Sequence, residues 1–321
     1  MNEEKHMQQC ISLAEKGKGH VSPNPLVGCV IVKNDEVIAE GYHHAFGEKH
    51  AEIDALDKVT GGAKGATLYV NLEPCCFHGK TPPCTERIIK EGIAEVVIGV
   101  RDPNPGVAGK GISELKNSEI KVREGILEDE CRVLNQFFFK WIATGLPYVT
   151  LKIAQTSDGF VAKEKCEKTI ITNLESRTEV HRLRAWYDAV LIGKGTAIAD
   201  KPLLNVRHVE GRDPKKIILD VEGELAKKVP IKNNRFDLKE LLKELAKQNI
   251  SSVLVEGGPT VWQSFLNENL ADQVIIFTSS KEFGKGVPVL PEGDLKKLTY
   301  KKSLRKRFDD DVMLQGFLKF Y

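Results

Sequence analysis

The first half of the chain alternates between short apolar runs and segments whose apolar positions have helical spacing, and this predicts alternating strands and helices. Gly145 and Pro147 follow the last helical segment, and such residues usually end a helix, so we expect a domain boundary there. Strands are predicted at 27–33, 37–41, 66–72 and 95–100, and helices at 7–14, 50–59, 83–91 and 128–143.

A second series of α/β elements begins with the strand-like run 148–154. A length of 321 residues suits two domains that each bury a core. We expect domains at 1–146 and 147–321, each a layered α/β unit. In the second, strands are predicted at 189–192, 216–219 and 252–255, further apolar segments at 274–277 and 312–320, and helices at 174–184, 238–248 and 261–269.

The composition favours small soluble substrates. Lys plus Arg number 47 against 45 for Asp plus Glu, and 41% of residues are hydrophobic, which argues against disorder and against a polyanion binder. The basic run 301–307 is followed at once by the aspartates 309–311, so we expect it to be a solvated surface. The apolar runs are strand-sized. We therefore expect a cytoplasmic protein without nucleic-acid or membrane partners.

Seven cysteines, an odd number scattered over a large chain, indicate reduced thiols and a metal site rather than a disulfide scaffold. His50 and Glu52 precede Cys75 and Cys84 by one predicted strand. One imidazole and two thiolates can hold zinc with its fourth position open to water, and a carboxylate outside the ligand set can move the proton. This combination is typical of a hydrolytic zinc deaminase.

The spacing places these residues at helix starts. Successive helical residues turn by about 100°, so His50 and Glu52 face one pocket only if they lie in a first turn. Pro83 similarly predicts Cys84 at the start of the next helix. Cys75 and Cys84 are nine residues apart, which inserts the loop 77–83 between them.

Alternatives remain at this stage. Cys76 competes with Cys75 as the ligand, although Cys75 directly follows a proline, as in the deaminase signature. A structural zinc site is a second alternative, but it normally needs a fourth protein ligand. A lone histidine, glutamate or cysteine is more often a cap or core residue.

Beyond these residues, the first half contains a series of longer motifs: SPNPLVGCVIV at 22–32, GYH at 41–43, HAE at 50–52, GATLYV at 65–70, LEPC at 72–75, GKTPPC at 79–84 and RDPNP at 101–105. With these motifs it closely resembles the bifunctional deaminase-reductase family of riboflavin biosynthesis. The resemblance implies a cytidine-deaminase-like three-layer domain with Zn²⁺ on His50, Cys75 and Cys84, and with Glu52 as proton shuttle. It also implies that Asn24, His43 and Lys80 contact a phosphorylated ribosylaminopyrimidine.

The second half resembles the reductase part of the same family. The resemblance implies a dihydrofolate-reductase-like domain that uses NADPH to open the ribose to a ribityl chain, in a homo-oligomer. The matching motifs are LKIA at 151–154, SDG at 157–159, GKGT at 193–196, PLLNVR at 202–207 and VEGG at 255–258. Implied substrate residues are Lys152, Thr172, Arg184, Leu204, Arg207 and Glu256, and implied cofactor residues are Ala154, Thr196, Asp200, Gly258, Pro259 and Thr260.

The chain departs from the family pattern at two places. Cys76-Phe77 stands where the family usually has Ser-His, and CEKTIIT at 166–172 replaces a segment that typically carries Ser and Trp, here Lys168 and Ile170. One alternative is therefore a deaminase whose second domain only binds nucleotide or assembles the oligomer. A base deaminase acting on nucleic acid is another, but the balanced charge argues against it.

Overall fold

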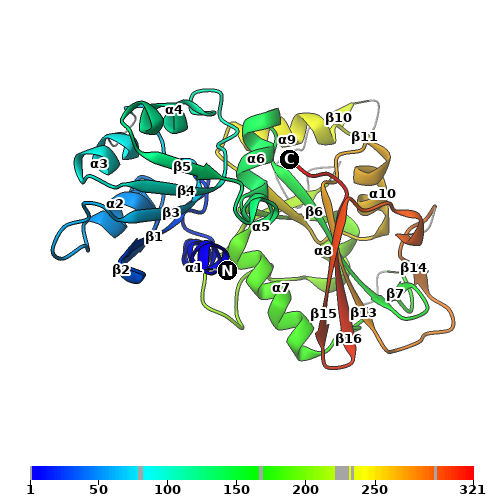
Figure 1. Ribbon diagram of the computed structural model, residues 1–321. Helices are drawn as coiled ribbons and strands as arrows, with labels where there is room; N and C mark the ends of the chain where they lie inside the picture. Colours follow the sequence, from blue (N-terminus) through cyan, green and yellow to red (C-terminus); the bar gives the residue numbers. More distant parts are fainter. Residues whose placement is uncertain (1, 79–81, 166–168, 221–230, 233–234, 293–294) are drawn as a thin grey trace. The chain divides into compact units, whose positions relative to one another are not determined.

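The computed structural model describes residues 2–78, 82–165, 169–220, 231–232, 235–292 and 295–321 (Figure 1). The chain divides into two compact units, Met1–Thr144 with Tyr321, and Gly145–Phe320. Gly145 has φ +67°, a left-handed conformation that ends the preceding helix as expected of a glycine in that position.

The first unit is built on a five-stranded sheet of order β2-β1-β3-β4-β5. β1 runs antiparallel to both β2 and β3, whereas β3, β4 and β5 are parallel, which requires a helical crossover between each pair. Both faces are therefore covered. The strands are β1 Gly28–Lys33, β2 Glu36–Tyr42, β3 Thr67–Leu72, β4 Glu95–Val100 and β5 Lys121–Glu124.

Helices pack on both faces of this sheet and make a three-layer unit. α1 contacts β1 and β3, and α5 contacts β4 and α1, while α2, α3 and α4 form the opposite layer (Figure 1). The candidate zinc residues lie on this second side. The helices are α1 Asn2–Glu15, α2 Ala51–Leu56, α3 Cys84–Lys90, α4 Lys110–Asn117, α5 Glu128–Leu134 and α6 Gln136–Thr144.

Two glycines allow the helices to approach the sheet closely. A Cβ on Gly28 would lie 2.1 Å from the Cys10 carbonyl oxygen of α1, and one on Gly41 would lie 2.4 Å from the Ala55 nitrogen of α2. Real Cβ contacts are never this short, so only glycine permits these packings. The close packing on Gly41 fixes α2, whose first turn carries Glu52.

The second unit contains a seven-stranded sheet of order β15-β16-β13-β6-β12-β8-β9. The five strands from β13 to β9 are parallel, and β16 and β15 continue the sheet in antiparallel fashion. The strands are β6 Tyr148–Thr156, β8 Ala189–Gly193, β9 Lys215–Leu219, β12 Ser252–Val255, β13 Gln273–Ser279, β15 Lys302–Phe308 and β16 Asp311–Phe317, with the small ladders β7 Phe160–Ala162 with β14 Val287–Pro288 and β10 Ile231–Lys232 with β11 Arg235–Phe236.

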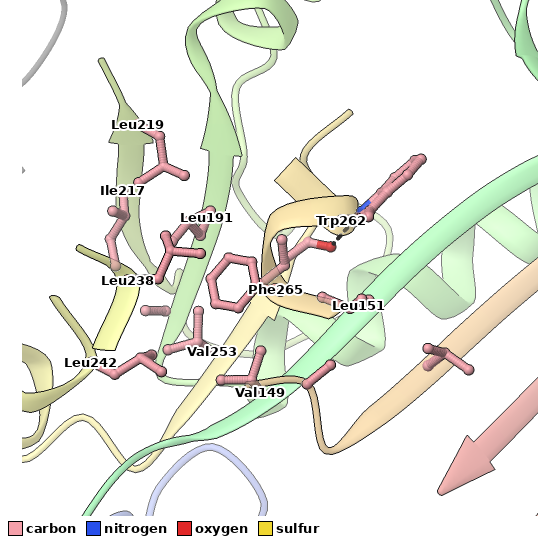
Figure 2. Close-up of a cluster of buried hydrophobic side chains, with 14 of the residues drawn as sticks. Val149, Leu151, Leu191, Ile217, Leu219, Leu238, Leu242, Val253, Trp262 and Phe265 are labelled. Carbon is pink, nitrogen blue, oxygen red and sulfur yellow. Dashed lines mark hydrogen bonds between the residues drawn. The ribbon is translucent and has the colours of Figure 1, made fainter. Parts of the chain in front are cut away.

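The core of this unit lies between the central strands and two helices. Figure 2 shows Phe265 packed toward Val253 and Leu191, whereas the Trp262 indole extends away from these residues and donates a hydrogen bond to the Val255 carbonyl at 3.3 Å. Because β12 is buried on both faces, its carboxyl end is held rigidly. The helices are α7 Leu174–Trp186, α8 Lys194–Asp200, α9 Leu238–Ala246, α10 Pro259–Asn267 and a short 3-10 helix at Leu295–Lys297.

Most predicted elements are confirmed, but the single helix at 128–143 is wrong. The structure breaks it at Asn135, whose φ of −102° and ψ of 19° separate α5 from α6. The Asn135 side chain instead bonds both backbone groups of Leu26. The basic run 301–307 is largely strand β15, with exposed side chains over most of its length.

Among the described residues, no helix is both long enough and apolar enough to cross a membrane.

Candidate active sites in the two units

Three candidate zinc ligands meet at the ends of three elements in the first unit. His50 is the residue before α2, Cys75 follows β3, and Cys84 is the first residue of α3. The His50 Nδ1 atom lies 3.4 Å from the Cys75 sulfur and 3.3 Å from the Cys84 sulfur. All three ligand atoms lie within 4.8 Å of one another, which is compatible with a shared metal ion.

The electrostatics of this group suit a zinc ion. A hydrogen bond from Cys84, together with one from His50, lowers the pKa of Cys75 to about 4. The Cys84 backbone N-H also points at the Cys75 sulfur, at 3.4 Å. The group thus holds a thiolate, which is the form that binds metal. Three protein ligands of this kind leave the fourth tetrahedral position open.

Glu52 lies in the first turn of α2, two residues after His50, and is only 3% exposed. Burial raises the pKa of its carboxyl group, and the nearby His50 opposes that rise. The carboxyl group also hydrogen-bonds Cys84. A buried carboxyl group beside the ligands, with its pKa moved toward neutrality, is suited to carry a proton.

Asn24 and His43 form a hydrogen-bonded pair next to the zinc ligands. His43 Nδ1 lies 2.9 Å from the Lys49 carbonyl oxygen, which can only accept, so Nδ1 carries the hydrogen. His43 Nε2 therefore accepts from the Asn24 amide, at 3.1 Å. Burial lowers the pKa of His43 and keeps it neutral. Its ring meets that of His50 edge-on, with centroids 5.6 Å apart.

The structure places Cys75, and not Cys76, in the ligand group. Burial raises the pKa of the Cys76 thiol. Lys80, predicted to contact the substrate from the inserted loop, lies outside the described residues.

Two buried asparagines that sequence reasoning missed hold the segment that carries Asn24. The Asn71 and Asn135 amides both donate to the Leu26 carbonyl at 2.9 Å, and Asn135 accepts from the Leu26 N-H at 2.7 Å. Asn71 also accepts from the Gly28 N-H at 2.7 Å. The signal in the sequence is the polar Asn71 within the otherwise apolar run 68–72.

Glu73 is a third residue that sequence reasoning missed. Its buried carboxylate accepts hydrogen bonds from the backbone N-H groups of Asp102 at 3.3 Å, Gly109 at 3.0 Å and Ile112 at 3.3 Å. It therefore fastens the segment 102–112 beside Pro74-Cys75. Burial, followed by repulsion from Glu73 and Cys75, raises the pKa of Asp102 to about 6.

The second unit contains a cavity of about 1060 Å³. Every residue predicted for the reductase half lines it. These are Lys152, Ala154, Thr172, Arg184, Thr196, Asp200, Leu204, Arg207, Glu256, Gly258, Pro259 and Thr260. The volume is at the upper end of the range for small-molecule sites, which suits a substrate together with a cofactor.

A buried ion pair crosses the cavity wall. Arg184 donates to both carboxylate oxygens of Glu256, at 2.6 and 2.9 Å, and the Lys152 ammonium lies 4.0 Å from the same carboxylate. Burial alone raises the pKa of Glu256, but Arg184 outweighs it and holds the pKa below its usual value. Burial lowers the pKa of Lys152 although Glu256 opposes it.

Two adjacent glycines open the cavity at the start of α10. Gly258 is the residue before the helix and Pro259 its first residue, as the sequence predicts. A Cβ on Gly257 would lie 2.9 Å from the Val261 side chain, and one on Gly258 would lie 3.4 Å from the Thr196 hydroxyl. The bare backbone leaves room for an anionic group at the helix N-terminus.

The described part of the second departure from the family pattern, residues 169–172, falls in the cavity wall. Ile170 is 58% exposed and lines the cavity beside Thr169 and Ile171, while residues 166–168 lie outside the described part. The lining residues that have no place in the sequence prediction include Arg177, His181 and His208.

Fold and sites together define the class, a zinc-type deaminase unit followed by a reductase unit. Residues 1–100 match the family model of the cytidine and deoxycytidylate deaminase zinc-binding region, and residues 147–314 match that of the RibD C-terminal domain. The chain belongs to the bifunctional RibD family, the deaminase-reductases of riboflavin biosynthesis.

Individual relatives agree over nearly the whole length. Riboflavin biosynthesis protein RibD of Aquifex aeolicus (strain VF5) is 40% identical, over 94% of this chain and 93% of its own. RibD of Escherichia coli (strain K12) is 36% identical, over 91% and 92%. The crystal structure of the Thermotoga maritima diaminohydroxyphosphoribosylaminopyrimidine deaminase/5-amino-6-(5-phosphoribosylamino)uracil reductase covers 98% of each chain at 39% identity, with a TM-score of 0.88.

Proposed function

We propose that this chain deaminates a diaminopyrimidine that carries a ribosylamino phosphate and then reduces the ribosyl group of the product to a ribityl chain. The name of the Thermotoga maritima relative supports this substrate and this order of reactions. The ligand group around His50 and the cavity around Glu256 supply a separate site for each step.

In the first step, His50, Cys75 and Cys84 would hold the zinc ion. When bound, zinc supplies a water molecule activated for attack on the amino-bearing ring carbon. Glu52 takes the proton of that water and passes it to the departing nitrogen, so that hydroxyl replaces the amino group and ammonia leaves. The neutral His43 and Asn24 orient the pyrimidine, and Lys80 adds a contact from the inserted loop.

In the second step, the start of α10 and the facing residues would bind NADPH, which supplies the hydride. Gly258, Pro259 and Thr260 offer backbone N-H groups and a hydroxyl at the helix N-terminus. Ala154, Thr196 and Asp200 complete the cofactor side. The substrate side consists of Lys152, Thr172, Arg184, Leu204, Arg207 and Glu256.

Charge distribution supports this division of the second cavity. Arg207 offers a planar donor group that grips phosphate, and Lys152 adds a buried cation, while the Arg184 guanidinium group is bonded to Glu256 and Asn205. Glu256 neutralises one of these charges through Arg184 and leaves a net positive substrate side. A phosphorylated substrate fits this balance.

The observation that carries the proposal is the convergence of His50, Cys75 and Cys84 with the buried Glu52. These residues come from separate parts of the chain. The test compares the wild type with Glu52→Gln, with Glu48→Gln as a matched control, because Glu48 is an exposed carboxylate on the preceding loop. Zinc content, ammonia release, and NADPH oxidation on deaminated substrate are measured for each protein.

We expect Glu52→Gln to keep one zinc per chain and to release no ammonia, while NADPH oxidation on deaminated substrate continues. Glu48→Gln should match the wild type in all three measurements. Ammonia release at the wild-type rate by Glu52→Gln would remove this residue from the mechanism. Ammonia release without NADPH oxidation in the wild type would favour the deaminase-only alternative.

The expected homo-oligomer, the cytoplasmic location and the absence of nucleic-acid and membrane partners stay predictions. Light scattering of the purified protein, with and without NADPH, tests the first. Fractionation of cells and binding to labelled RNA and to anionic vesicles test the others.

A further inference from the structure

His181 lies in the wall of the second cavity and belongs to none of the predicted sites. It comes from α7, one turn before Arg184, and is only 4% exposed. Its Nδ1 atom accepts a hydrogen bond from the backbone N-H of Arg207 at 3.3 Å. A buried imidazole on α7 is therefore attached directly to the loop that carries a proposed substrate arginine.

The bond requires a neutral ring. Nδ1 can accept only when it has no hydrogen, so the ring hydrogen is on Nε2. Burial, helped by Arg184, His208 and Arg207, lowers the pKa of His181 to about 4. The ring of His208 packs edge-on against it, with centroids 4.6 Å apart. At neutral pH the ring is thus uncharged, as this hydrogen bond requires.

The loop around Arg207 has no regular secondary structure to hold it. Leu204 has a φ of +50°, and the segment 201–214 contains neither helix nor strand. Side chains fasten it instead: Arg184 donates to the Asn205 carbonyl at 3.3 Å, and Asp213 accepts from the Val206 N-H at 2.8 Å. At Arg207 itself, the hydrogen bond to His181 holds the loop.

The side chain of Arg207 depends on this backbone. Its Nη1 donates to the Asn205 side-chain oxygen at 2.7 Å, which orients the guanidinium group within the loop. Without an acceptor at His181, the Arg207 N-H would lose this hydrogen bond, and the loop would no longer be held at this point. The guanidinium group would move with it.

We propose that His181 is a positioning residue of the reductase site, which fixes Arg207 for the phosphate group of the substrate and thereby sets the preference for a phosphorylated substrate. The inference rests on the proposed reductase function. It assigns His181 no contact with the reacting atoms and no part in hydride transfer.

Four variants test the proposal: His181→Leu, which removes the acceptor at similar volume, His181→Asn, which keeps an acceptor near the place of Nδ1, Arg207→Ala, and the double variant His181→Leu with Arg207→Ala. Arg182→Ala is the control, because Arg182 is an exposed residue of the same helix. KM and kcat are measured with NADPH and the deaminated substrate, both phosphorylated and dephosphorylated.

We expect His181→Leu to raise KM for the phosphorylated substrate about tenfold, the size of one lost hydrogen bond with its partner left unpaired. KM for NADPH should stay unchanged, and His181→Asn should restore most of the loss. The double variant should be no worse than Arg207→Ala alone, because His181 acts through Arg207. With dephosphorylated substrate the effect of His181→Leu on KM should disappear.

Equal losses of His181→Leu on both substrates, or independent losses in the double variant, would overturn the proposal in favour of a purely structural role. Thermal unfolding of each variant separates that outcome from a general loss of stability. If the wild type itself fails to oxidise NADPH with either substrate, the proposed reductase function is wrong. That result differs from the results that would contradict the role of His181 alone.

Discussion

Removing the negative charge of Glu256 should destabilise the second unit strongly. In Glu256→Gln the side chain keeps its shape, but Arg184 loses its anionic partner in a buried site. An arginine cannot give up its proton to relieve this, whereas Lys152, the other nearby cation, can release its own. The cost therefore comes mainly from the guanidinium group of Arg184.

The contacts of Arg184 and Glu256 set the size of the expected loss of stability. Arg184 and Glu256 are joined by two hydrogen bonds, at 2.6 and 2.9 Å, and their side chains are only 12% and 7% exposed. Breaking a buried pair from one side costs about 3–5 kcal/mol, because it leaves an unpaired buried charge. For a unit of this size that lowers the midpoint of thermal unfolding by roughly 10 °C.

Differential scanning calorimetry measures this shift, and the zinc-holding unit in the same sample serves as an internal reference. Glu240→Gln is the matched control, because Glu240 pairs with Lys243 on an exposed helix face and its loss should leave the transition unchanged. Replacing both partners, with Arg184→Met and Glu256→Leu, should recover much of the loss, because no unpaired charge then remains.

Two results would refute this reasoning. One is a shift in Glu256→Gln no larger than that of the Glu240→Gln control. The other is a double variant as unstable as the sum of the two single variants, which would mean that the two side chains contribute separately rather than as a pair.

Other expected outcomes concern the first unit. Gly28→Ala should prevent native packing of α1, because the new methyl would lie 2.1 Å from the Cys10 carbonyl oxygen, and circular dichroism after expression checks this. Asn135→Leu leaves the Leu26 N-H without an acceptor and should cost about 1–3 kcal/mol in urea unfolding. The pKa of Asp102 rises from 3.8 to about 6 on folding, so its contribution to stability is greatest at acidic pH and is lost as the pH rises through 6. The stability of Asp102→Asn relative to the wild type should therefore increase between pH 4.5 and 7.5, by on the order of 2 kcal/mol. Urea unfolding midpoints of both proteins, measured with saturating zinc at both pH values, check this. A relative stability that decreases over this range would show that the sign is wrong. Removing zinc with a chelator should abolish ammonia release and spare NADPH oxidation on deaminated substrate, because the ligands all lie in the first unit.

Local patterns predict most of the fold. β4 and β12 have the bounds that the apolar runs indicate, because both strands are almost wholly buried and read as continuous apolar segments. The break at Asn135 escapes such reasoning, since its cause is Leu26, far away in sequence. β15 escapes it too, because a strand at the sheet edge with mostly exposed side chains carries little apolar alternation.

The residues of the candidate site also fall into two groups, those that the sequence predicts and those that it does not. The ligand residues and Glu52 follow from residue types and short spacings. His50, Glu52 and Cys84 lie at helix starts that proline or periodicity predicts, and Cys75 follows a predicted strand. Asn71, Glu73 and His181 do not, because their roles are bonds to backbone groups that only tertiary folding brings near. Chemistry-bearing groups are thus visible in the sequence, whereas the residues that position them are visible only in the structure.

The order of strands in the second sheet has a consequence for synthesis of the chain. Among the described strands, β6 pairs with β12 and β13, which begin at Ser252 and Gln273. While the ribosome is still making the intervening residues, β6 has unpaired backbone edges and exposed apolar side chains, so it needs protection from aggregation. Lys152 and Ala154, both on β6, enter the cavity wall only after those late strands emerge. A product truncated before Ser252 therefore lacks the reductase site altogether, although every zinc ligand is already present in it.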